Sequence, residues 1–85
     1  MKVIIVYRHE SDHAREVIDY LRDFKRQTGH EISTLDPDSP DGRDTCRVYD
    51  VVEYPTILAI SDDSRLQNMW RGRPLPTISE LSFYV

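Results

Sequence analysis

The sequence contains a single cysteine, Cys46, among its 85 residues. One thiol cannot form a disulfide or a dithiol redox couple within the chain. Long apolar runs are also absent. The run Val3–Tyr7 is too short for a membrane span or for the core of a signal peptide. We therefore expect no membrane partner and a reducing, cytoplasmic location.

An excess of positive charge is absent as well, because the formal net charge is −4. Nucleic-acid binding needs clustered Lys and Arg for the phosphates, and Arg71 with Arg73 is too small a group to supply them. We therefore expect no nucleic-acid partner. Charges of both signs are interspersed and long single-sign blocks are absent, so no segment resembles a disordered tail. Residues 1–85 are predicted to form one domain with a modest core.

The N-terminal half predicts a strand, a helix and a second strand. Val3–Tyr7 is mostly β-branched and apolar, which is typical of a strand buried on both faces. Ser11 is the predicted N-cap of the helix, and Gly29 is its predicted stop. Glu31–Leu35 is the predicted second strand. The helix should bury a stripe of apolar residues at helical spacing: Ala14, Val17, Ile18, Leu21 and Phe24.

The middle of the chain predicts a loop and then a short helix. Asp36–Gly42 is dense in turn residues and is predicted to be a loop. Arg43–Asp50 is the predicted helix, with Cys46 and Tyr49 facing inward.

The C-terminal part predicts a hairpin and a last helix. Two strands, Thr56–Ile60 and Arg65–Arg71, flank the turn signal at residues 62–64. Thr77 and Glu80 match a capping box, in which each side chain satisfies a backbone amide at a helix start. Three apolar residues should lie on one face of this helix: Ile78, Leu81 and Val85.

These elements predict an α/β fold in the order β-α-β-α-β-β-α. Parallel pairing of the first two strands and a C-terminal antiparallel hairpin make a four-stranded mixed sheet. Helices are expected on both faces of this sheet.

This order, together with the stretch Val48–Leu58, resembles the thioredoxin-like superfamily in its minimal thioredoxin or glutaredoxin form. In that stretch Tyr54-Pro55-Thr56 leads into an apolar strand. The resemblance implies that Pro55 is a cis proline facing the functional site. It covers essentially the whole chain.

The resemblance also shows what is missing. The family has Cys-x-x-Cys where the first strand meets the first helix, and the helix N-terminus stabilises a thiolate there. The corresponding positions here are Ser11, Asp12, His13 and Ala14. The buried acid of the family's first strand corresponds to Ile5. We therefore expect no dithiol–disulfide exchange at this site.

Three functions follow as hypotheses. The preferred one is a redox-inactive module that binds a protein or peptide as an added strand. Its implied site comprises Ser11, Asp12, His13, Ala14, Tyr54, Pro55 and Thr56. The alternative is a glutathione-binding or glutathione-transferase-like enzyme in which Ser11, or less readily Tyr7, stabilises the thiolate of glutathione. Transferases normally carry a further helical domain, which residues 1–85 do not provide. An assembly role through a sheet edge or an exposed helix is neither favoured nor excluded.

Residues 9–13 also match the zinc-protease motif H-E-x-x-H. That motif needs both histidines on one helix face. Here a strand precedes it and the helix is expected to begin within it, so His9 should lie outside the helix and His13 on the surface. A zinc site is therefore the remote alternative, and we expect no metal or other cofactor.

Four other side chains have a structural and a functional interpretation. Cys46 fits a buried small apolar residue better than a reactive thiol. The aromatic residues Tyr7, Tyr54 and Trp70 suit either a ligand groove or ordinary packing.

Overall fold

A four-stranded sheet in the order β2-β1-β3-β4 organises the chain in the computed structural model, which describes residues 1–85. β1 is parallel to β2 and antiparallel to β3, and β3 is antiparallel to β4. The predicted element order and the mixed sheet are confirmed. The elements are β1 (Lys2–Val6), α1 (Ala14–Thr28), β2 (Ser33–Leu35), α2 (Pro40–Tyr49), β3 (Thr56–Ile60), β4 (Leu66–Arg71) and α3 (Ile78–Ser82).

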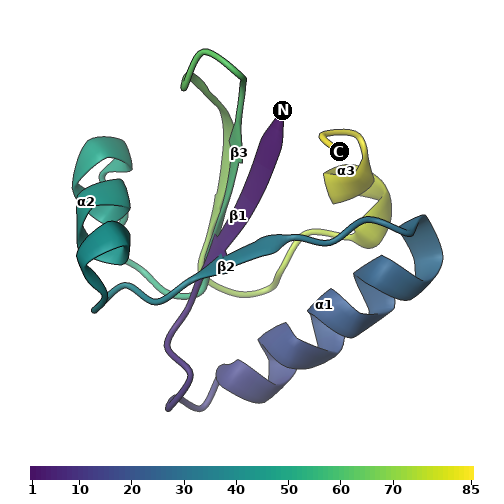
Figure 1. Cartoon of the computed structure of the whole chain (residues 1–85). Coiled ribbons are helices and arrows are strands. Elements are labelled where there is room, and N and C mark those ends of the chain that lie inside the picture. The colour runs from purple at the N-terminus through teal and green to yellow at the C-terminus, as the bar shows by residue number, and fades with distance from the viewer.

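Helices cover both faces of the sheet, as predicted. Figure 1 shows α2 on one side of the central strand β1, and α1 and α3 on the other. β1 alternates between the two layers, since Val3 and Ile5 pack towards α1 and α3 whereas Ile4 and Val6 pack towards α2. Both faces of β1 are therefore buried, which explains its continuous apolar run. No helix is both long and apolar enough to cross a membrane.

The first helix begins later than the sequence suggested. α1 starts at Ala14 with His13 as its N-cap, and no side chain caps its first turn. It ends at Gly29 as predicted, in a left-handed conformation whose N–H donates to the Lys25 carbonyl. Ile18 is 52% exposed, because it lies at the edge of the apolar stripe and not at its centre.

The second helix begins inside the predicted loop. α2 starts at Pro40, because the Ser39 side chain accepts a hydrogen bond from the Gly42 N–H at 3.0 Å and Pro occupies the first helical position. The prediction of a loop through Gly42 was therefore wrong for residues 40–42. Cys46 and Tyr49 face inward as expected, half-buried against the sheet.

The C-terminal helix is shorter than predicted. Thr77 caps it by accepting from the Glu80 N–H at 3.1 Å. The capping box is not reciprocal, because Glu80 accepts from the Thr77 hydroxyl at 3.2 Å and not from its backbone amide. The helix ends at Ser82, so Val85 lies beyond it and is 42% exposed. The second strand is also shorter than predicted and begins at Ser33.

Candidate functional site

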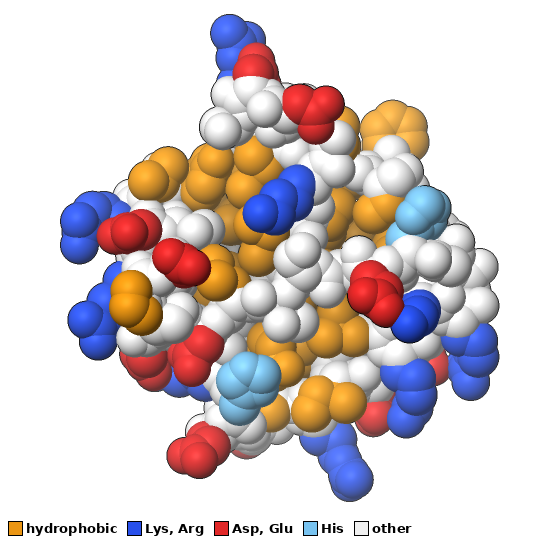
Figure 2. Space-filling model, viewed as in Figure 1, with side chains coloured by type: hydrophobic (Ala, Val, Ile, Leu, Met, Phe, Trp, Pro, Cys, Tyr) orange, Lys and Arg blue, Asp and Glu red, His pale blue; other side chains and the backbone are white.

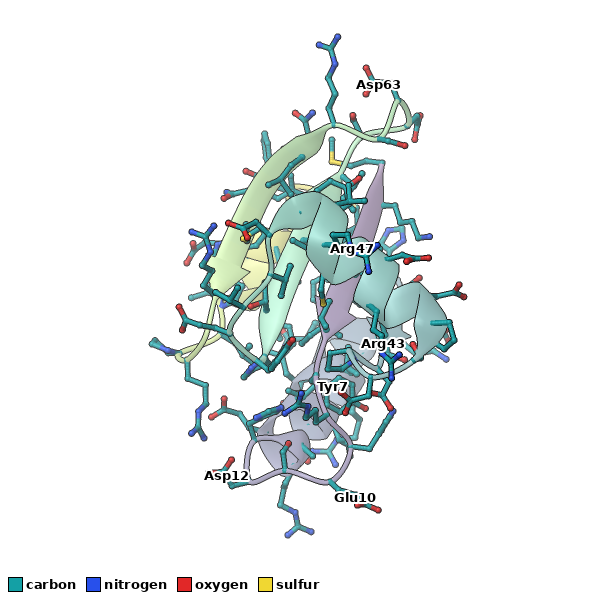
Figure 3. The ribbon with its side chains drawn as sticks, turned by 90° about the vertical axis from the view of Figure 1, so that its left-hand side faces the viewer. Tyr7, Glu10, Asp12, Arg43, Arg47 and Asp63 are labelled. Atoms are coloured by element: carbon teal, nitrogen blue, oxygen red, sulfur yellow. The ribbon has the colours of Figure 1, made fainter.

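Three connecting segments meet at one edge of the sheet. Val6 at the end of β1 pairs with Leu35 at the end of β2 and with Thr56 at the start of β3. The segments 7–13, 36–39 and 50–55 therefore lie together, and they contain most of the predicted site residues. Figure 3 shows Tyr7, Glu10 and Asp12 at this end of the molecule and Asp63 at the opposite end.

Arg8 joins these three segments, and the sequence analysis did not identify it. Its guanidinium lies 5.0 Å from the centre of the Tyr54 ring, a cation–π contact. It also donates a hydrogen bond to the Asp38 carboxylate at 3.3 Å. No local pattern could have revealed these contacts, because they depend on strand pairing across distant parts of the chain.

The Ser11 side chain does not cap α1, contrary to the prediction. Its hydroxyl donates to the Arg8 carbonyl at 2.6 Å, within a turn that precedes the helix. The turn is closed by the Ala14 N–H, which donates to the Ser11 carbonyl at 3.3 Å. The Ser11 proton is thus committed to the chain's own backbone.

His13 is buried, whereas a surface position was expected. It is 8% exposed, and its Nε2 accepts a hydrogen bond from the Arg8 N–H at 3.3 Å. This bond requires an unprotonated Nε2. Its burial follows from its position at the start of α1, where the ring lies 6.5 Å from that of Tyr7.

Asp12 and Ala14 have opposite environments. The Asp12 side chain is 87% exposed, with one carboxylate oxygen 4.0 Å from the Arg73 guanidinium. Ala14 is 7% exposed and belongs to the core under α1. Of the four positions 11–14, only Ser11 and Asp12 therefore offer appreciable side-chain surface.

The Tyr54–Pro55 peptide bond is cis. Pro55 and Thr56 are buried, and both are anchored to neighbouring backbone. The Pro55 carbonyl accepts from the Gly72 N–H at 2.8 Å, and the Thr56 hydroxyl donates to the Glu53 carbonyl at 2.6 Å. These two residues hold the segment in place, and Tyr54 is the one that offers a contact surface.

Tyr54 has two properties of a contact residue. Its backbone N–H donates no hydrogen bond to the rest of the chain, and its carbonyl accepts none. Its ring is half-buried, and burial is the largest cause that raises the pKa of its hydroxyl. The neighbouring Cys46 adds to this increase, whereas the positive charge of Arg8 opposes it.

The hollow at this edge is polar. It has a volume of about 300 Å³ and is lined by charged or imidazole side chains alone. Its lining residues are Arg8, His9, Glu10, Asp36 and Asp38. No group of three or more His, Cys, Asp or Glu side chains is arranged to hold a metal ion. The H-E-x-x-H residues precede α1, so its two histidines do not share a helix face.

The other aromatic candidates are packing residues in this structure. Tyr7 is 4% exposed within the core under α1, where burial raises its pKa. Trp70 packs against the same core and meets Tyr84 edge-on, with the ring centres 5.4 Å apart.

The architecture and the cis-proline edge define a thioredoxin-like fold. The solved structure of thioredoxin 1 from the thermophilic eubacterium Thermosipho africanus TCF52B superposes on it with a TM-score of 0.65. The match covers 95% of this chain and 85% of that one, at 16% sequence identity. No family model and no curated protein sequence matches the chain. The likeness at this identity establishes the fold, and function has to be argued from the site.

Proposed function

We propose that this chain is a redox-inactive thioredoxin-like domain that binds an extended peptide or protein segment beside Tyr54. The single observation that carries the proposal is the unbonded backbone of Tyr54, which lies two residues before β3. A free N–H and a free carbonyl on one residue can exchange two hydrogen bonds with an added strand. This contact needs no cysteine.

The surroundings of Tyr54 support the same function. Pro55 and Thr56 fix the backbone, so that little conformational entropy is lost when a partner pairs with it. The Tyr54 ring and the Arg8 guanidinium present a flat apolar and cationic surface next to that backbone. Aromatic and Arg side chains are the types enriched at binding hot spots.

A dithiol–disulfide couple cannot form within one copy of the chain. Its only thiol, Cys46, is half-buried under α2, and a disulfide requires two. We place the domain in a reducing, cytoplasmic setting, where this thiol stays free.

The test begins with peptides selected from a random linear library displayed on phage. A selected peptide is titrated into ¹⁵N-labelled protein, and we expect amide shifts at Arg8, Tyr54 and Ser11–Ala14. The same peptide N-methylated at alternate residues should lose binding, because it cannot pair as a strand. Lys25→Ala, at an exposed position of α1, is the matched control and should bind normally.

Three outcomes would replace this proposal. If no selected peptide shifts the Tyr54 amide, or if N-methylation has no effect, strand pairing at this site is wrong. If reduced glutathione shifts Ser11–Ala14 and Tyr54–Thr56 while S-methylglutathione does not, the glutathione alternative is favoured. Zinc-dependent shifts at His9 and His13 would favour the metal alternative.

A further inference from the structure

The outer edge of β4, like that of β2, has no strand paired with it. β4 is the last strand of the sheet, and no strand pairs with its far side. The Gly72 N–H donates to the Pro55 carbonyl, so Gly72 and Pro55 form a hydrogen-bonded pair. Alternation along an antiparallel ladder then directs the backbone groups of Trp70 towards β3 and those of Met69 and Arg71 outward.

The middle of this edge, at Met69, is partly occupied by the chain itself. A bulge between Ala59 and Ile60 interrupts the register, which leaves Gln67 without a partner in β3. The outward N–H of Met69 donates to the side-chain oxygen of Asn68 at 2.8 Å. An incoming strand would have to displace the Asn68 amide to reach this N–H.

Asn68 is held in place from the C-terminal segment. Its side-chain nitrogen donates to the Tyr84 hydroxyl at 3.0 Å, and the Tyr84 ring packs edge-on against Trp70. Asn68 and Tyr84 together thus act as a latch over the middle of the edge. Beyond the latch, the same alternation directs the backbone groups of Arg71 away from β3, and no backbone hydrogen bond outside the helices and strands involves them.

The charge of this region differs from that of the rest of the protein. Residues 65–79 contain Arg65, Arg71 and Arg73 and no Asp or Glu, in a chain of net charge −4. The carboxylate of Glu53, from the segment before β3, lies beside Gly72 at the end of β4. Arg65 and Arg73 have carboxylates within 4.0 Å, whereas Arg71 has none. The face in Figure 2 shows no comparable segregation, because positive and negative side chains are mixed there.

We propose that the outer edge of β4 binds an extended acidic peptide as a fifth strand, and that the Asn68–Tyr84 latch controls access to it. The peptide backbone pairs with Met69 and Arg71, and a carboxylate of the peptide pairs with the Arg71 guanidinium. A second copy of this chain is a poorer occupant, because two β4 strands would bring like charges together. This site is separate from the one beside Tyr54 and goes beyond the function proposed above.

The test uses a synthetic peptide of alternating Val and Glu, with a Val and Lys peptide as the control. The Val and Glu peptide should shift the Met69 and Arg71 amides, and the Lys peptide should not. Tyr84→Phe removes the hydrogen bond to Asn68 but keeps the ring, and it should tighten binding about five-fold, the effect of one hydrogen bond. Arg71→Gln should weaken it by a similar factor, about five-fold.

Several results would overturn the proposal. One is the absence of shifts at Met69 and Arg71 with the acidic peptide, in both the wild type and Asn68→Ala, where the edge is fully open. Equal binding of the two peptides would remove the charge argument. Concentration-dependent shifts of the same amides without peptide would make a second copy the occupant. Shifts at Tyr54 report on the other site, so the two proposals can fail independently.

Discussion

The two faces of the sheet differ in the size of the hydrophobic core that covers them. The face under α1 and α3 has a core of ten buried residues, whereas the face under α2 has five. Two helices cover the first face and one ten-residue helix covers the second. Two hollows, of about 390 and 350 Å³, flank α2, and both are lined by Lys2, Ile4 and Thr45. Stability is therefore concentrated on the face under α1 and α3.

The part of the candidate site around Tyr54 draws its contacts from the thinner face. Tyr54 and Cys46 pack against the core under α2, and Arg8 and Asp38 extend from the neighbouring segments. Sparse packing lets side chains adjust to a partner at low cost in stability. The comparison suggests that one face holds the fold while the other carries the surface available for binding.

The largest expected effect tests this difference with neighbouring residues of β3. Ile57 faces α1 and α3, Leu58 faces α2, and both are fully buried. We expect Ile57→Ala to lower the free energy of unfolding by about 4 kcal/mol and Leu58→Ala to lower it by about 2 kcal/mol. The cost of Leu58→Ala is smaller because the thinner face around it can relax or admit water. Urea unfolding of both variants measures the two free energies. Equal costs, or a larger cost for Leu58→Ala, would break the comparison.

The second prediction concerns the attachment of α2. A Cβ atom on Gly42 would lie 1.7 Å from the Asp36 carbonyl oxygen, a contact that requires backbone movement. Gly42→Ala should therefore destabilise the protein by about 2–3 kcal/mol. Thermal unfolding followed by circular dichroism measures this loss.

Gly29 is the matched control, at the end of α1. Its φ of +77° disfavours a side chain, but no atom lies within 4 Å of the added Cβ. Gly29→Ala should cost only about 1 kcal/mol, from the left-handed conformation alone. If the Gly42→Ala variant is as stable as Gly29→Ala, the backbone at Asp36 can move away from the added Cβ atom at little cost in stability.

The third prediction concerns an unsatisfied hydroxyl group, that of Tyr20, in the thicker core. The Tyr20 hydroxyl is buried without a hydrogen-bond partner, and burial together with the charge of Glu80 raises its pKa to about 12. The unfolded chain loses this proton near its ordinary pKa of 10.0, before the folded chain does. The contribution of Tyr20 ionisation to the free energy of unfolding is therefore fully present below about pH 10. It is lost as the pH rises from there towards 12, so the protein becomes less stable over this range.

Tyr20→Phe should remove this loss and leave stability at pH 7 unchanged or higher by about 1 kcal/mol, because an unsatisfied hydroxyl is eliminated. Denaturant unfolding at pH 7 and at pH 10.5 measures both effects. A variant that is clearly less stable at pH 7 would mean that the hydroxyl has a partner, such as a bound water. Tyr49→Phe serves as the control, since its hydroxyl donates to the Ser64 carbonyl.

The sequence predicted the strands and the element order better than the helix starts. Val3–Tyr7 and Thr56–Ile60 are dense in β-branched or apolar residues, and packing on both faces of the sheet enforces that composition. The start of α2 was missed because Ser39-Pro40 lies within a run of turn residues, where a cap and a loop have the same composition. Ser11 was misassigned because its hydroxyl bonds the Arg8 carbonyl instead of an amide of the helix.

The candidate site was only partly predictable. Tyr54-Pro55-Thr56 was identified from the resemblance to the thioredoxin-like superfamily, and it leads into β3 as expected. Arg8 and Asp38 were missed, since they are 30 residues apart and meet only because β1 pairs with β2. The burial of His13 depends likewise on how the turn before α1 folds back on Arg8.

The smallest expected effect compares one tyrosine from each face. Tyr54 lies beside Cys46 on the face under α2, whereas the pKa of Tyr7, in the core under α1, is raised by burial alone. Cys46→Ala should lower the pKa of Tyr54 towards its ordinary value, while leaving it raised because burial remains the largest cause. The pKa of Tyr7 should not move, and stability should fall by about 1 kcal/mol or less. A pH titration of the tyrosine ring carbons by NMR measures both groups in one sample. A shift at Tyr7 as large as that at Tyr54 would mean that the two faces are coupled through the sheet, and the separation between a stable face and a binding face would then have to be abandoned.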